Sequence, residues 1–380
     1  MTEVLEFASI PFKSLDDEKP VYLSLYPPKV GEANLVQHRK VPTIIYFHGG
    51  GLTVGNRDSW HPTWLQRRAY TSGFAFIVPN YRLIPPSTGH SILSDIKDLF
   101  AFLVKTDLHA VVRSIYPHAQ AEAYNIAIDR DAIIVAGSSA GGLCAYLAAV
   151  HCNDPRPRAV LSMYGMGGNF FMPHYFVPKK EVFFRGRELL EPSNFSEYLY
   201  PRAKALGEMT DSPLQYHSNE YHIPGYPANP RMLLARLYLQ MGVFLDYYTD
   251  CHDPSLSARL GKIFLKHTGT NARNRTALES EHEMMEYAEA IPEHHHCLFP
   301  QLHVTTNWPP TILCHGTADT AVLFEESLNL GYALEKAGVP VLTYRINGEE
   351  HSFDYNADAE EKYGEIFNTI VATLQKWVSA

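Results

Sequence analysis

Short apolar runs, separated by longer stretches with helical periodicity, mark the first 165 residues of the chain. Three of these runs are nearly continuous in β-branched and aromatic residues, as strands buried on both faces of a sheet are. They cover residues 43–47, 74–78 and 132–136. A fourth run, residues 21–26, alternates apolar and polar side chains and ends at Pro27-Pro28, so it predicts an antiparallel edge strand.

Helical spacing fills the intervals between these runs. Apolar residues recur every three or four positions at Ile92, Ile96, Leu99 and Leu103. Residues 140–149 follow the run 132–136 and are rich in small side chains, which favours a closely packed helix. Strands that alternate with helices predict an α/β fold, with a mostly parallel central sheet and helices on both faces.

The pattern changes after Tyr164-Gly165, where strand-like runs give way to helical, proline-containing and aromatic stretches. One apolar stripe there predicts a single amphipathic helix through Leu234, Leu237, Tyr238, Met241, Leu245 and Tyr248. Strand patterns return at 311–314 and 341–344. A final helix places Ile366, Phe367, Ile370, Leu374 and Trp377 on one face. We therefore expect an α/β core at residues 1–167 and 310–380, interrupted by a large, mainly helical cap or lid at residues 168–309.

Composition excludes several classes of partner. The 380 residues are 46% hydrophobic and carry a net charge of −9 without a long basic run, which argues against nucleic acid and anionic membranes. No apolar run reaches the ~20 residues of a membrane-spanning helix. Charged pairs such as Lys179-Lys180 are expected to be solvated, as are Asp95 and Asp98 on their helix.

Five scattered cysteines without a CxxC pair are typical of reduced thiols in a cytosolic protein. The first seven residues, Met-Thr-Glu-Val-Leu-Glu-Phe, lack the basic and apolar regions of a signal peptide, so a cytoplasmic protein is expected. The sequence does not decide the oligomeric state and is compatible with a homodimer.

The string Gly137-Ser138-Ser139-Ala140-Gly141 follows a predicted buried strand and opens a predicted helix. A G-x-S-x-G string in that setting is typical of the nucleophile elbow, in which a strained turn holds the serine hydroxyl above the sheet. Glycines such as Gly137 and Gly141 allow the neighbouring backbone to approach closely. Ser139 is therefore the candidate nucleophile.

His48-Gly49-Gly50-Gly51 directly follows the strand at 43–47. Amides of such a glycine run can point at an oxygen that becomes negative during acyl transfer. The amides of Gly49, Gly50 and Ala140 are the candidate oxyanion hole. His48 and Gly51 are expected to support this loop, with the imidazole of His48 bonded to the backbone.

A serine nucleophile needs a base, and the base needs an acid that orients it. Of 19 histidines, His351 follows the last predicted strand, and Asp319 lies in a loop that leaves the preceding one. The order Ser, Asp, His is that of the α/β-hydrolase triad. His315 is expected to fix its own turn. Three nearby acids, Glu349, Glu350 and Asp354, stay open as alternative partners of the histidine.

These motifs resemble the hormone-sensitive-lipase-like branch of the α/β-hydrolases, which comprises carboxylesterases and lipases. His48-Gly49-Gly50-Gly51 is similar to the HGGG loop of that family. Tyr81-Arg82-Leu83, with prolines at 85 and 86, is similar to its Tyr-Arg-Leu-Ala-Pro segment. Ser139 stands where the family carries Gly-Asp-Ser-Ala-Gly-Gly, although Ser138 replaces the aspartate.

The resemblance covers roughly residues 41–165 and 308–378, and includes the approach to His351-Ser352-Phe353. Asp319 lacks the Asp-Pro-Leu context common in the family, and the insertion of about 140 residues is longer than its usual cap. The resemblance implies an α/β-hydrolase fold and a carboxylic-ester substrate, and it implies no cofactor.

The insertion offers candidates for an apolar acyl or aromatic pocket, which are Phe170, Phe171, Met172, Tyr175, Phe176, Phe183 and Phe184. Adjacent histidines at 294–296 with Cys297 do not converge easily on one ion, so no metal is expected. The sequence thus predicts a serine hydrolase that acts on a small to medium, partly apolar ester. Acyl transfer, cyclisation or condensation with the same triad is the alternative, and a receptor-like ligand-binding protein is a third.

Overall fold

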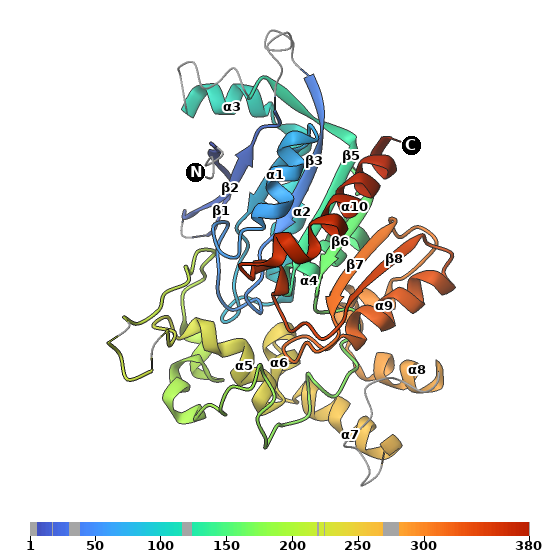
Figure 1. Cartoon of the computed structure of the whole chain (residues 1–380). Helices are drawn as coiled ribbons and strands as arrows, with labels where there is room; N and C mark the ends of the chain where they lie inside the picture. The colour runs from blue at the N-terminus through green and yellow to red at the C-terminus, as the bar shows by residue number, and fades with distance from the viewer. Residues whose placement is uncertain are drawn as a thin grey trace.

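The computed structural model describes residues 6–16, 18–29, 39–115, 124–218, 220–223, 225–268 and 281–379. Within these residues one sheet of eight strands forms the centre, in the order β1-β2-β4-β3-β5-β6-β7-β8 (Figure 1). The strands are β1 (Ala8–Ser14), β2 (Pro20–Tyr26), β3 (Arg39–Phe47), β4 (Ala75–Pro79), β5 (Ile126–Ser138), β6 (Ala159–Met163), β7 (Thr311–Gly316) and β8 (Val341–Ile346).

The sheet is mostly parallel, as predicted. All strands from β4 across to β8 pair in parallel, and β1 and β2 add an antiparallel corner. The prediction of residues 21–26 as an edge strand was wrong, because β1 pairs with the outer side of β2. The register of β1 shifts between Pro11 and Lys13. A proline cannot donate to a strand ladder, so it fits this outermost strand.

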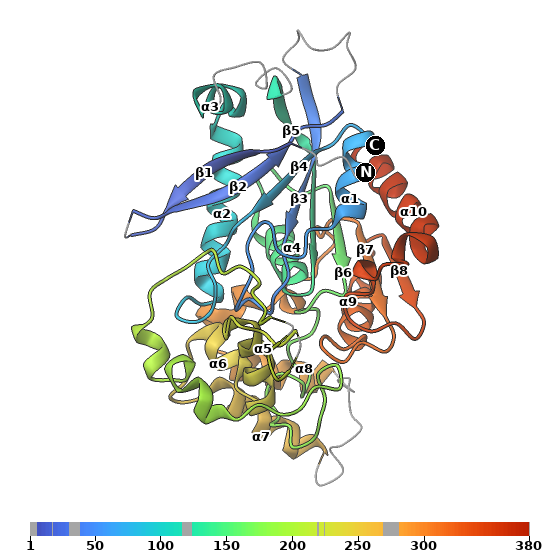
Figure 2. The same ribbon diagram turned by 60° about the vertical axis from the view of Figure 1, so that its left-hand side comes forward.

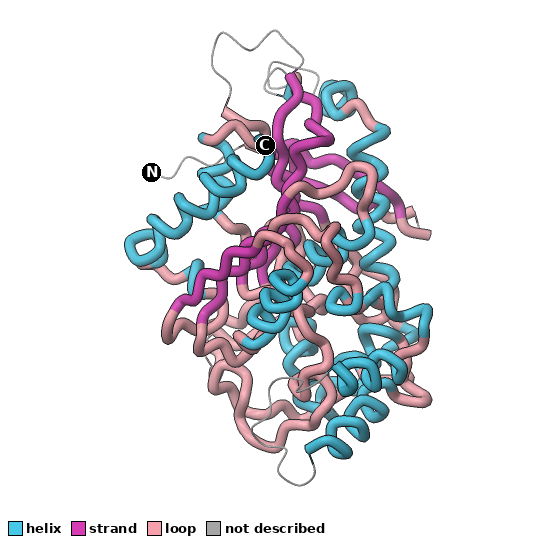
Figure 3. Tube along the Cα trace, turned by 90° about the vertical axis from the view of Figure 1, so that its right-hand side faces the viewer, coloured by secondary structure: helices cyan, strands magenta, loops and turns pink. Residues whose placement is uncertain are grey.

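Helices cover both faces of the sheet (Figure 3). On one face lie α1 and α10, joined by a stack of Trp64 on Phe367 with ring centroids 4.2 Å apart. On the other face lie α2, α4 and α9. The α-helices are α1 (Thr63–Thr71), α2 (Gly89–Lys105), α3 (Leu108–Ile115), α4 (Ala140–His151), α5 (Arg231–Met241), α6 (Phe244–Thr249), α7 (Leu256–Thr268), α8 (Glu281–Ala290), α9 (Glu325–Lys336) and α10 (Ala359–Ser379).

The chain between β6 and β7, residues 164–310, is here called the β6–β7 segment. Its helices α5, α6, α7 and α8 gather beyond one end of the sheet, at the bottom of Figures 1 and 2. Its apolar side chains continue the core without a gap, since Leu237, Tyr248 and Phe299 belong to the same cluster as Leu143 of α4. The separate cap at residues 168–309 stays a prediction.

The single amphipathic helix predicted through Leu234 and Tyr248 is in fact two helices. Helix α5 ends before Gly242, which has a φ of +67°, and α6 begins at Phe244. A Cβ on Gly242 would lie 2.7 Å from the backbone nitrogen of Pro178, so close backbone packing accompanies the break. The apolar periodicity did not reveal the break between α5 and α6, because both helices direct apolar residues towards the core.

Of the charged residues that were expected to be solvated, Asp95 is buried and Lys179 is half-buried. Asp95 is 1% exposed and accepts hydrogen bonds from Lys13 Nζ and the backbone nitrogen of Arg82, both at 2.7 Å. Lys179 donates to the carbonyl oxygens of His174 and of Leu239, the latter at 2.9 Å. Asp98 keeps 47% of its side chain exposed, as expected. Among the described helices, none combines the length and hydropathy that crossing a bilayer requires.

Candidate active site

Ser139 occupies a strained turn between β5 and α4. Its φ of 53° and ψ of −123° are unusual for a residue with a side chain, and its backbone nitrogen donates to the carbonyl of Met163 at 3.0 Å. Gly137 and Gly141 make the turn sterically possible. A Cβ on Gly137 would lie 2.1 Å from the carbonyl oxygen of Gly141, and one on Gly141 would lie 2.0 Å from that of Phe47.

The glycine loop after β3 packs against this turn. A Cβ on Gly49 would lie 3.4 Å from Cβ of Ser139. Gly50 has a φ of +110°, and a Cβ there would lie 2.1 Å from the carbonyl oxygen of Val54. A Cβ on Gly51 would lie 2.2 Å from Cβ of Ala235 on α5. The glycines therefore let the loop fit between Ser139 and the β6–β7 segment.

His48 holds the base of this loop. Its ring stacks on Tyr81 with centroids 4.3 Å apart, and its Nδ1 lies 2.8 Å from the carbonyl oxygen of Gly49. The hydroxyl of Tyr81 donates to the carbonyl of His48 at 2.7 Å. Burial lowers the pKa of His48 to about 4, so its ring is neutral near pH 7. These contacts agree with the expected backbone-shaping position of His48.

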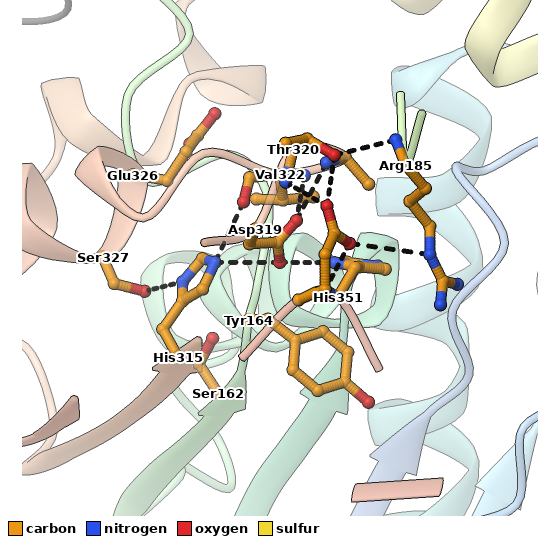
Figure 4. Close-up of polar contacts among 12 residues, drawn as sticks. Ser162, Tyr164, Arg185, His315, Asp319, Thr320, Val322, Glu326, Ser327 and His351 are labelled. Carbon is orange, nitrogen blue, oxygen red and sulfur yellow. Dashed lines mark hydrogen bonds and ion pairs between the residues drawn. The ribbon is translucent and has the colours of Figure 1, made fainter. Parts of the chain in front are cut away.

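Asp319 and His351 meet at the edge of the sheet where β7 and β8 end (Figure 4). Nδ1 of His351 lies 2.6 Å from Oδ2 of Asp319. Oδ1 of Asp319 accepts hydrogen bonds from the backbone nitrogens of Ala321 and Val322, each at 2.9 Å. Burial alone would raise the pKa of Asp319, but the charge and hydrogen bonds of His351 and His315 hold it below its usual value. Asp319 is therefore ionised and fixed in orientation.

His315 does more than fix its own turn. Its Nε2 lies 3.2 Å from Oδ2 of Asp319, and its Nδ1 lies 2.7 Å from the hydroxyl oxygen of Ser327 on α9 (Figure 4). Both histidines thus contact the same carboxylate. The sequence placed His315 in the loop that leads to Asp319 but gave no sign that their side chains touch.

The other acids near His351 serve different groups. Glu350 accepts a hydrogen bond from the backbone nitrogen of His351 at 2.6 Å. Asp354 accepts from the hydroxyl of Tyr164 at 2.5 Å and from Nε1 of Trp64 at 3.0 Å. The ring of Tyr164 then packs edge-on against the imidazole of His351, with centroids 4.7 Å apart. Among the described contacts, Asp319 is the carboxylate that reaches the imidazole.

Ser139, His351 and the three loop glycines line one pocket of about 160 Å³. Ala140, the third candidate oxyanion donor, is fully buried at the start of α4. Within the described residues no hydrogen bond joins the hydroxyl of Ser139 to His351, so their direct contact stays a prediction. A larger hollow of about 640 Å³ lies elsewhere, between Arg130 and Trp377, and contains none of these residues.

The β6–β7 segment supplies most of the opposite wall. Of the aromatic candidates named from the sequence, Phe184 lines the pocket, whereas Phe170, Phe171, Tyr175 and Phe176 are buried in the apolar cluster. One face of α5 lines it with Met232, Ala235, Arg236 and Leu239. These four positions follow i, i+3, i+4 and i+7 spacing and therefore share one face of the helix. The sequence analysis missed this face because another face of the same helix is more apolar.

The histidines at 294–296 do not form a metal centre in the described part of the chain, where no group of three potential ligands is arranged to hold an ion. His295 has its two ring nitrogens directed at different partners. Nδ1 lies 2.8 Å from Nε2 of His90, and Nε2 lies 3.0 Å from Sγ of Cys251. His90, His295 and Cys251 therefore form a chain of contacts through the ring of His295.

Comparison with known families supports the fold. Residues 44–218 match a family model described as the alpha/beta hydrolase fold, and residues 265–376 match that of the prolyl oligopeptidase family. Among solved structures, the apo form of Thermogutta terrifontis esterase 2 has a TM-score of 0.53 and 14% identity, covering 99% of this chain and 96% of that one. Pyrobaculum calidifontis esterase has a TM-score of 0.51 and 17% identity, covering 98% and 86%.

Two curated relatives share shorter regions. A Phoma protein named probable carboxylesterase M8 is 28% identical over 150 residues, which are 39% of this chain and 44% of that protein. Tuliposide A-converting enzyme 2, a chloroplastic protein of Tulipa gesneriana, is 26% identical over 204 residues, or 53% of this chain and 47% of that protein. The chain thus spans about half the length of the curated relatives it matches. The chain has the α/β-hydrolase fold and resembles the hormone-sensitive-lipase-like branch that its motifs indicate.

Proposed function

We propose that the protein is a serine carboxylic-ester hydrolase that acts through Ser139, His351 and Asp319. The observation that carries the proposal is the 2.6 Å contact between Nδ1 of His351 and Asp319, beside a pocket that Ser139 also lines. An imidazole held through Nδ1 presents its other nitrogen as a base. The strained backbone of Ser139 supports its assignment as the nucleophile.

In the proposed reaction, the hydroxyl oxygen of Ser139 attacks the ester carbonyl while Nε2 of His351 takes the hydroxyl proton. His351 then gives this proton to the departing alcohol, which leaves an acyl-serine. Water attacks the acyl group with His351 again as the base, and the carboxylic acid and free Ser139 result. Contact between Ser139 and His351 is expected to form with substrate bound, since catalytic hydrogen bonds often tighten only then.

The amides of Gly49, Gly50 and Ala140 are proposed to receive the negative oxygen of the tetrahedral intermediate. One such donor typically contributes ~3 kcal/mol to lowering the barrier. The positive φ of Gly50 supports a loop that turns amides towards the pocket, and Ala140 lies at the start of α4, where helix amides are free to donate.

We propose that the β6–β7 segment acts as the cap over this site. Met232, Ala235 and Leu239 of α5 face the pocket and would exclude water from the reacting groups. The volume of about 160 Å³ is below the ~300 Å³ at which pockets for drug-sized ligands begin, so a short acyl group fits best.

Turnover of 4-nitrophenyl acetate, with labelling by a fluorophosphonate probe, tests the proposal. Wild-type protein should hydrolyse the ester and take up the probe, and Ser139→Ala should do neither. Ser138→Ala is the matched control, because it removes the neighbouring hydroxyl and should leave labelling intact. Labelling of Ser139→Ala would overturn the assignment. Product analysis with an added alcohol separates hydrolysis from acyl transfer.

A further inference from the structure

The pocket wall made by α5 contains a positive charge. Arg236 lines the same pocket as Ser139 and His351, and only 7% of its surface is exposed. Its pocket neighbours are mostly apolar and include Met232, Ala235 and Leu239. Arg236 also lines an adjoining hollow of about 120 Å³ together with Arg187, so its guanidinium borders both spaces, with Nε buried and the outer nitrogens accessible.

Arg236 lacks a protein partner in the described part of the chain. No hydrogen bond or ion pair to its side chain is present there, and its Nε is buried without an acceptor. Arg231, on the same helix, differs, because its guanidinium donates to the carbonyl oxygens of Thr53, Ile84 and Pro85. Burial, together with the positive charge of nearby Arg187, lowers the pKa of Arg236, and Tyr226 opposes this shift.

The other arginine in the pocket wall is already neutralised. Nε of Arg185 lies 3.5 Å from Oε2 of Glu350. Arg185 therefore has a carboxylate partner within the protein, whereas Arg236 does not. A purely structural arginine would be expected to have such a partner, because an uncompensated buried charge destabilises the fold.

We propose that Arg236 is a specificity-determining residue that binds a carboxylate carried by the ester substrate, so that the preferred substrates are esters with a free carboxylate group. This inference rests on the proposed hydrolase function and names its substrate class. A guanidinium can bind both oxygens of a carboxylate through parallel hydrogen bonds. A neutral ester would leave the charge of Arg236 without a partner. The enzyme should therefore prefer an ester that carries a carboxylate over the matching neutral ester.

Paired substrates test the inference. The first pair is mono(4-nitrophenyl) adipate and its methyl ester, which place the carboxylate or its neutral replacement on the acyl side. The second pair is 4-carboxyphenyl acetate and its methyl ester, which place it on the alcohol side. We expect wild-type protein to favour the charged member of at least one pair, by about 100-fold in kcat/KM.

Arg236→Met should lower kcat/KM for the charged ester by about the same factor and leave the neutral ester within a few-fold. Arg236→Lys should keep part of the preference, because it retains the charge without the planar fork. Arg187→Gln is the matched control, since it removes a nearby positive charge outside the Ser139 pocket and should leave the preference unchanged. The melting temperature of each variant shows that it is folded.

Equal turnover of both members of each pair by wild-type protein would overturn the inference while leaving the hydrolase proposal intact. An equal loss on charged and neutral esters in Arg236→Met would also overturn it. If wild-type protein turns over none of the esters, the hydrolase proposal fails. Calorimetric binding of monomethyl adipate to Ser139→Ala and to the double variant Ser139→Ala, Arg236→Met then decides the role of Arg236. Weaker binding to the double variant supports it, and equal or absent binding refutes it.

Discussion

His315 and His351 contact the same carboxylate oxygen of Asp319, at 3.2 Å and 2.6 Å (Figure 4). Removal of His315 should therefore raise the pKa of Asp319, which these two imidazoles hold below its usual value. A carboxylate whose folded pKa is lowered stabilises the protein above its unfolded pKa and loses that contribution as the pH falls through the folded one. With His315→Ala we expect lower stability at neutral pH and a smaller further loss of stability on acidification than in wild type.

Urea unfolding at pH 7 and at pH 3 measures this effect. KM should change little, because His315 lies behind Asp319 and does not line the pocket. Ser327→Ala, which removes the partner of Nδ1 of His315 at 2.7 Å, should give a smaller change in the same direction. Equal losses of stability between pH 7 and pH 3 in His315→Ala and in wild type would show that His315 does not lower the pKa of Asp319.

Asp319→Asn should lower kcat by about 10⁴-fold with KM within a few-fold, because an amide nitrogen at Oδ2 would favour the wrong tautomer of His351. Steady-state kinetics on 4-nitrophenyl acetate checks this. Glu350→Gln is the matched control, since Glu350 binds the backbone nitrogen of His351 and leaves its ring to Asp319. A comparable loss in both variants would contradict the acid assignment.

Arg231→Met should destabilise the protein by roughly 3 kcal/mol, because it removes donors from three carbonyl oxygens around the glycine loop. Urea unfolding of the variant measures the change. Arg236→Met, five positions later on α5, should leave stability unchanged or raise it, because the guanidinium there has no protein partner in the described residues. The reverse order of the two effects would contradict this account of α5.

Glu326→Gln should flatten the pH dependence of stability. Burial raises the pKa of Glu326 from 4.5 to about 7, although hydrogen bonds from Tyr175 and Asn169 oppose the shift. A carboxyl with a raised folded pKa contributes its full stability below pH 4.5 and loses it as the pH rises through about 7. This contribution is at most about 3 kcal/mol.

Urea unfolding at pH 5 and pH 8 compares the two proteins. Wild-type stability should fall more steeply between these values than that of Glu326→Gln, whose amide can donate to the hydroxyl oxygen of Tyr175. Glu325→Gln removes the same charge from a partly exposed neighbour and should keep the wild-type slope. Equal slopes in wild type and Glu326→Gln would rule out Glu326 as their source.

Gly50→Ala should impair both folding and catalysis, because a Cβ there would lie 2.1 Å from the carbonyl oxygen of Val54. Gly73→Ala is the matched control, since Gly73 also has a positive φ, of 81°, but open space within 4 Å of the added atom. It should show only the backbone strain, about 1 kcal/mol. Melting temperatures and kcat are measured for both variants. A larger loss in Gly50→Ala than in Gly73→Ala reports the steric clash in addition to the backbone strain.

The local patterns of the chain predicted the strands and the turns that follow them. Continuous apolar runs located β3, β4 and β5, and the glycine spacing around Ser139 located the strained turn. Strands and tight turns depend on residues that are neighbours in the chain, so their patterns can be recognised in a single sequence.

The burial of charged side chains could not be predicted from the sequence, because it depends on partners far away in the chain. Asp95 is buried because Lys13 and Arg82 come from other elements to bind it. Lys179 is half-buried, and its Nζ donates to the carbonyl oxygens of Leu239 and of His174 in its own loop. Likewise, Arg236 looks like an ordinary exposed helix residue until its neighbours are known, and its isolation is visible only in three dimensions.

Gly51 touches Ala235, so helix α5 rests directly on the loop that borders the reacting groups. The residues that would perform bond cleavage come from turns of the sheet, while the facing surface comes from one short helix of the β6–β7 segment. Exchange of side chains at 232, 236 and 239 should therefore redirect substrate preference and leave the cleavage chemistry untouched. Position 235 is different, because any side chain larger than alanine would push the loop itself.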